Sequence, residues 1–119
     1  MKHLIEIAYQ WGVRCFGNEH MHNRKVRGLR FAEEAIELAQ ALDVPQDVMT
    51  KLVATVYSRP PGDAYQEVGG SMVTLGCLCR TMGVDPEHAL LWEINRVLAK
   101  DPLHFAKRNQ DKIDLELDA

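Results

Sequence analysis

Apolar residues recur along this chain every three or four positions, and no stretch of useful length alternates between apolar and polar residues as a strand would. The pattern therefore predicts an all-α protein, a bundle of four to five helices. The expected helices cover residues 3–16, 26–42, 45–57, 63–82 and 86–100. The polar stretch 17–23 is predicted to be a loop, and the charged segment 103–119 a partly ordered tail or a short helix that frays at its end.

Residues typical of helix ends separate these segments. Asp63, followed by Gln66 three positions later, resembles a capping box, and Gly83 is expected to end the helix that begins there. Asp85 and Pro86 are expected to begin the next one, because aspartate caps a helix and proline suits its first turn. These signals make the helix boundaries in the second half of the chain the best defined.

Length and composition narrow the class of protein. With 119 residues, of which 46% are hydrophobic, a single domain over residues 1–119 is expected. The net charge of −3 argues against nucleic acid or an anionic membrane surface as a partner. No apolar run approaches the roughly 18–20 residues of a membrane span, and the N-terminus lacks the layout of a signal peptide. An odd count of three cysteines argues against a disulfide framework and favours a cytoplasmic protein.

The segment 27–37 carries the most informative charges. Arg27, Arg30, Glu34 and Glu37 are spaced so that they share one stripe of the predicted helix, and Glu33 lies beside it. Clustered carboxylates suit a hard cation such as Mg²⁺, and arginines one or two turns earlier suit phosphate oxygens. The alternative is an ordinary solvated acidic face.

The helix predicted over 63–82 carries an isolated acid, Glu67, and no charged residue lies between Val68 and Cys79. Such an apolar helix is expected to be largely buried, and a glutamate on it then needs a partner or a metal. The same helix contains Gly69, Gly70 and Gly76, each of which costs it about 1 kcal/mol relative to alanine. Either these glycines let another helix approach closely, or Gly70 leaves room for a carboxylate from elsewhere or for a water.

The motifs "RFAEEAIELAQAL" and "EVGG" resemble those of the MazG-like superfamily of all-α nucleotide pyrophosphohydrolases. The stretch "SRPPG" before "QEVGG" is similar to a branch of that superfamily that is often phage-encoded. The resemblance implies that Glu34, Glu37 and Glu67 bind Mg²⁺, with Mn²⁺ as a possible substitute. The fourth acid of the family pattern falls on Gly70 here, and Glu93 on the following helix is the expected replacement.

The activity implied by the resemblance is Mg²⁺-dependent hydrolysis of a ribo- or deoxyribonucleoside triphosphate to the monophosphate and pyrophosphate. Glu34, flanked by other acids, is the expected base for the attacking water, and Glu33 is a further metal ligand. Triphosphate contacts are expected from Arg27, Arg30, Asn95 and Lys100. Trp11 either stacks on the base or simply packs in the core. The base and the sugar that such a site prefers are not indicated.

Two other functions stay open. Gly70 in place of an acid favours a non-catalytic nucleotide-binding or regulatory protein on the same scaffold, and the acids on helix 26–42 are also compatible with a plain helical interaction module.

A homodimer or tetramer is expected, since one chain of this size cannot cover a helix that is apolar on several sides. His20 and His22 are interpreted as part of a loop near the site, or as residues without a function, rather than as zinc ligands. The cysteines at 77 and 79 are expected to be buried.

Overall fold

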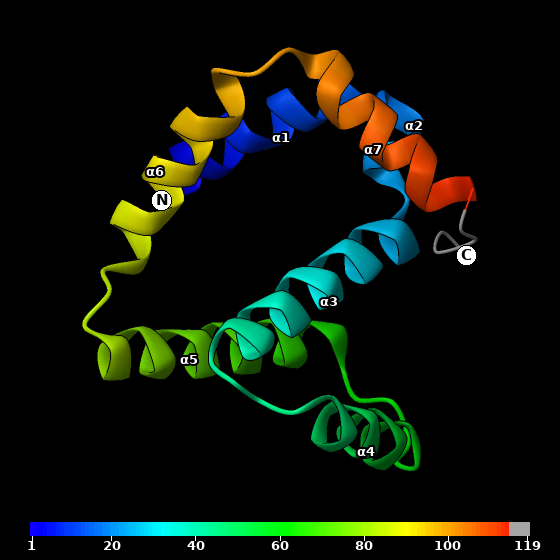
Figure 1. The fold of residues 1–119 in the computed structure, drawn as a ribbon, viewed down its shortest axis with the longest axis vertical. Helices are drawn as coiled ribbons and strands as arrows, with labels where there is room; N and C mark the ends of the chain where they lie inside the picture. The colour runs from blue at the N-terminus through cyan, green and yellow to red at the C-terminus, as the bar shows by residue number, and fades with distance from the viewer. Residues whose placement is uncertain (115–119) are drawn as a thin grey trace. The chain divides into compact units, whose positions relative to one another are not determined.

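The structure, a computed structural model, describes residues 1–114, and the chain over this range is helical with no strand (Figure 1). The all-α prediction is confirmed. The predicted number of four to five helices is wrong, because residues 1–114 form seven helices. They are α1 (Lys2–Phe16), α2 (Asn18–His22), α3 (Arg24–Ala41), α4 (Gln46–Tyr57), α5 (Ala64–Met82), α6 (Pro86–Leu98) and α7 (Pro102–Asp114).

Helix α2 occupies the stretch that was predicted to be a loop. Gly17, with φ of 86°, ends α1, and the chain re-enters helical geometry at once. Met21 is the one buried residue of α2, and it fills the space beside Gly12 that a side chain there would occupy. A helix of five residues with a single buried side chain has no apolar period, so the sequence pattern could not reveal it.

Helix α7, a regular helix of 13 residues, occupies most of the segment that was predicted to be a tail. The Asp101 carboxylate accepts a hydrogen bond of 2.9 Å from the backbone N–H of Leu103 and so caps the start of the helix. Phe105 is buried and ties α7 to α1. The last part of the predicted tail, residues 115–119, lies outside the described residues.

The predicted caps of α5 are confirmed. The Asp63 carboxylate accepts a hydrogen bond of 3.0 Å from the backbone N–H of Gln66. Gly83 ends the helix in the left-handed conformation, with φ of 69° and ψ of 28°.

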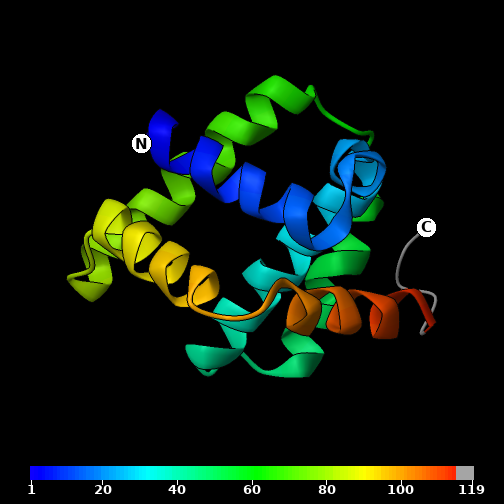
Figure 2. The same ribbon diagram turned by 90° about the horizontal axis from the view of Figure 1, so that it is seen from above.

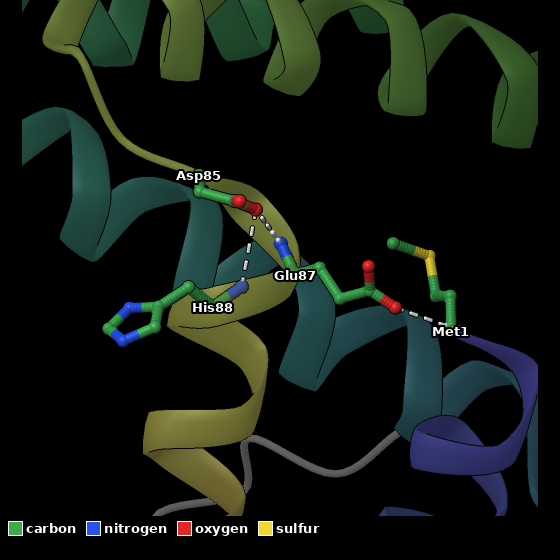
Figure 3. Close-up of polar contacts among 4 residues, drawn as sticks. All are labelled: Met1, Asp85, Glu87 and His88. Carbon is green, nitrogen blue, oxygen red and sulfur yellow. Dashed lines mark hydrogen bonds and ion pairs between the residues drawn. The ribbon is translucent and has the colours of Figure 1, made fainter.

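The start of α6 also follows the sequence prediction (Figure 3). The Asp85 carboxylate accepts hydrogen bonds from the backbone N–H groups of Glu87, at 2.9 Å, and His88, at 3.3 Å. The side chain of Glu87 also lies 3.1 Å from the amino group of Met1, in an exposed ion pair that contributes little to stability.

The contacts divide the chain into two compact units: residues 1–31 with the described residues from 84 onward, and residues 32–83. In the first unit, α1 packs against α2, α6 and α7 (Figures 1 and 2). Its core contains Cys15, Val97 and Phe105, with Trp11 and Phe16 packed against them. The predicted single domain stays a prediction.

The second unit, formed by α3 from Ala32 onward with α4 and α5, has almost no core. Cys79 is its one buried residue, and α4 has none. Val68 is 63% exposed and Val73 is 67% exposed. The expected burial of the helix over 63–82 is therefore not found within a single chain, and Cys77, also expected to be buried, is exposed.

Candidate functional site

The acids of the predicted metal site lie on α3 and α5, in the second unit. Glu34 and Glu37 are exposed on α3, while Glu33 is half-buried. Glu67 is exposed in the first turn of α5, and its carboxylate lies beside Gly62 in the preceding segment. The residues are accessible to a ligand, but exposure alone does not bring them together.

Within residues 1–114, no three His, Cys, Asp or Glu side chains are placed where they could hold one metal ion. The acids of α3 and α5 thus do not converge in a single chain. A side chain at Gly70 would have open space around it, so no described residue fills the place of the missing acid. The same is true of Gly69 and Gly76, and the close approach of another helix to these glycines is not found among the described residues.

The remaining predicted residues, Glu93 and Asn95 on α6 and Lys100 just after it, lie at the surface of the first unit. Glu93 pairs with Arg96 through two contacts, one of them 3.1 Å between Oε2 and a terminal guanidinium nitrogen. This pairing competes with the predicted role of Glu93 as a metal ligand. Asn95 and Lys100 are exposed.

The predicted substrate-binding residues Arg27 and Trp11 meet in the first unit around one aromatic ring. The ring of Phe16, at the end of α1, has the guanidinium carbon of Arg27 5.7 Å from its centre. The rings of Trp11 and His20 lie 5.8 and 5.9 Å away, centre to centre. Helices α1, α2 and α3 thus each place a side chain against Phe16.

Helix α7 completes this arrangement. Phe105 packs edge-on against Trp11, with ring centres 4.9 Å apart, so the core-packing alternative for Trp11 is realised in the structure. Further along α7, the side chain of Asn109 hydrogen-bonds to His20. We call Trp11, Phe16, His20, Arg27, Arg30 and Asn109 the basic–aromatic cluster.

Positive charges repel one another in this cluster. Burial lowers the pKa of Arg27, the charge of Arg30 lowers it further, and Tyr9 acts in the opposite direction. The pKa of His20 is lowered by burial and then by Arg27, and a hydrogen bond that His20 donates to Asn109 opposes this lowering. Two cations and a desolvated histidine side by side are an arrangement that a bound anion would stabilise.

Two hydrogen-bond donors of the cluster are buried without an acceptor among the described residues. They are Nε of Arg27 and the indole nitrogen Nε1 of Trp11. Neither nitrogen can accept a hydrogen bond, so only an oxygen or another acceptor can satisfy them. Sequence patterns did not identify Phe16 or Asn109 as parts of a site. Helices α1, α2 and α3 follow one another directly, but periodicity does not show how they pack, and Asn109 on α7 lies far along the chain.

Comparison of this chain with protein-family models, with curated proteins and with solved structures found no match. Within residues 1–114, no helix has both the length and the apolar character needed to cross a membrane.

Proposed function

We propose that this protein is a nucleoside triphosphate pyrophosphohydrolase, which uses water to convert a ribo- or deoxyribonucleoside triphosphate to the monophosphate and pyrophosphate. The observation that carries the proposal is the order of charges along α3. Arg27 and Arg30, both half-buried, are followed one turn later by the carboxylates of Glu34 and Glu37. One helix thus offers cations for the phosphates and acids beyond them.

The proposed roles follow from the chemistry of these side chains. The planar guanidinium groups of Arg27 and Arg30 suit phosphate oxygens, to which they donate paired hydrogen bonds. Glu34 would take the proton from the attacking water. Asn95 and Lys100 remain proposed as further phosphate contacts. Trp11 is not proposed as a contact of the base, because its ring packs against Phe105.

Dependence on Mg²⁺, or on Mn²⁺ in its place, is part of the proposal. The proposed ligands are carboxylates, which suit either ion, and they are Glu33, Glu34, Glu37, Glu67 and Glu93. The donor set does not fit a metal ion within one described chain, because no three of its members converge. Metal binding would therefore require α3 and α5 to be brought together by association or by substrate.

The acids that do not converge around a metal favour a second function, a non-catalytic nucleotide-binding or regulatory protein. Such a protein needs the basic–aromatic cluster but no metal centre. The open space around Gly70, where the family pattern has an acid, supports this alternative.

We further propose that the chain forms a homodimer, or a tetramer built from dimers, through α4 and α5. Large apolar side chains on these two helices are exposed, most of them by about half or more. They are Val48, Leu52, Val53, Val56, Tyr57, Tyr65, Val68, Met72, Val73, Leu75 and Met82. Because α5 has no charge between Val68 and Cys79, two copies can meet there without burying charged groups.

The exposed area is of the size that a stable dimer needs. Fully burying one large apolar side chain removes about 60–120 Å² from water, so half-exposed side chains on α4 and α5 offer about 500 Å² of apolar area per copy. A standard interface buries about 800 Å² per partner, of which about 450 Å² is apolar.

The free thiols of all three cysteines agree with the reduced, cytoplasmic location that we propose.

The enzyme is tested by product analysis with each ribo- and deoxyribonucleoside triphosphate, with and without Mg²⁺. We expect monophosphate and pyrophosphate only with the metal. Glu37→Gln should abolish turnover, whereas Glu6→Gln, an exposed change on α1, should not. An unchanged rate for Glu37→Gln would refute the catalytic proposal, and tight binding of a triphosphate without turnover would establish the second function instead.

The dimer is tested by light scattering. Leu52→Glu places a charge on the apolar face of α4 and should yield monomers, whereas Thr50→Glu lies on the polar face with Asp47 and Lys51 and should not. A wild-type monomer would contradict the proposed interface.

A further inference from the structure

The basic–aromatic cluster lies entirely within the first unit, so its geometry requires neither a second copy nor the acids of α3 and α5. We propose that this cluster is a phosphate-binding site that takes the polyphosphate part of a nucleotide without a metal ion. The choice of polyphosphate as ligand rests on the proposed function, whereas the anion-binding character rests on the cluster alone.

The unsatisfied donors provide the first argument. Leaving a buried donor without an acceptor costs about 1–3 kcal/mol, and more for a charged group. Nε of Arg27 and Nε1 of Trp11 both lack acceptors, and both belong to side chains that lie beside the ring of Phe16. An oxyanion is a ligand that accepts from both an arginine and an indole N–H.

The aromatic surroundings provide the second argument. The guanidinium carbon of Arg27 lies 5.7 Å from the centre of the Phe16 ring, and this contact keeps water from part of the cation. Charge-assisted hydrogen bonds are stronger when the donor is shielded from water in this way. The site therefore prefers a charged ligand to a neutral one.

The third argument concerns the number and origin of the polar groups. Arg27 comes from α3, His20 from α2 and Trp11 from α1, and Asn109 on α7 hydrogen-bonds to His20. Arg30 adds a second positive charge close enough to repel Arg27. Polar groups that several helices place around one ring suit an anion with several acceptor oxygens, such as phosphate, and the positive charge of Arg27 suits a chain of phosphates.

The test is calorimetric titration of the whole protein with inorganic tripolyphosphate in the presence of EDTA. We expect the wild-type protein to bind, and Arg27→Gln to weaken binding by at least about tenfold, as expected for the loss of one charge-assisted hydrogen bond. Arg24→Gln removes the same charge from the exposed first turn of α3 and should change affinity less than about twofold. Sulfate should bind more weakly than tripolyphosphate.

The proposal is overturned if the wild-type protein does not bind tripolyphosphate without metal, or if Arg24→Gln weakens binding as much as Arg27→Gln. If Arg27→Gln does not fold by circular dichroism, His20→Gln serves in its place, with the same expected direction. Binding without any nucleotide hydrolysis would sustain this site while refuting the enzyme. Nucleotide hydrolysis with an unchanged KM in Arg27→Gln would sustain the enzyme while refuting this site.

Discussion

Replacing Phe105 with alanine should destabilise the first unit more than most single changes. Phe105 is 7% exposed, lies in the core with Cys15 and Val97, and packs edge-on against Trp11 with ring centres 4.9 Å apart. A buried Phe→Ala change costs about 3–5 kcal/mol, of which the aromatic pair accounts for about 0.5–1.5 kcal/mol. For a domain with about 5–15 kcal/mol of stability, this is about a fifth or more of the total.

The matched control is Leu103→Ala on the same helix. Leu103 is 74% exposed, so its loss should change the free energy of unfolding by less than about 0.5 kcal/mol. Urea unfolding followed by tryptophan fluorescence and by far-ultraviolet circular dichroism measures both variants. We expect the midpoint to fall sharply for Phe105→Ala alone. Equal midpoints for the two variants would show that α7 does not pack on α1 as described, and would also remove Asn109 from the basic–aromatic cluster.

Three further predictions concern other parts of the chain. The pKa of His20 is lowered in the folded chain. As pH falls below about 6.5, the unfolded chain therefore takes up a proton at His20 before the folded chain does. Stability should therefore fall from pH 7 to pH 5.5, and less so in His20→Asn, as measured by thermal unfolding at each pH. A thiol reagent should modify the exposed Cys77 first, because Cys15 and Cys79 are buried and burial raises the pKa of Cys15; rapid labelling of all three would contradict this. Asp85→Ala should cost about 1 kcal/mol in urea unfolding through the lost cap of α6, and Asp85→Asn much less.

Local chemistry made much of the secondary structure predictable. Asp63, Gly83 and Asp85 act on groups within three residues of themselves, so their effect is visible in a short window of sequence. The apolar period marked the long helices for the same reason, because residues three and four apart share a helix face wherever the helix lies. Helix α2 escaped prediction because its formation depends on the contact of Met21 with Gly12, nine residues earlier.

Residues that are close in sequence could predict only part of the candidate site. The spacing of Arg27, Arg30, Glu34 and Glu37 places them on one stripe of α3, and the continuous helix provides that stripe. The convergence of α3 with α5 around a metal depends on contacts between distant segments, and the described residues do not make it. The replacement role of Glu93 likewise depended on its surroundings, and its actual partner is Arg96, three residues away.

The sequence by itself determined that this protein is helical, where most helices begin and end, and which charges share the face of α3, because all of these depend on residues within one or two turns of each other. Only the tertiary structure decided that α1, α2, α3 and α7 bring Trp11, His20 and Arg27 around Phe16. It also decided that α4 and α5 leave their apolar faces exposed within one chain. Both outcomes depend on how separate helices pack against one another, and a periodic pattern specifies that a face will be buried without specifying what will cover it.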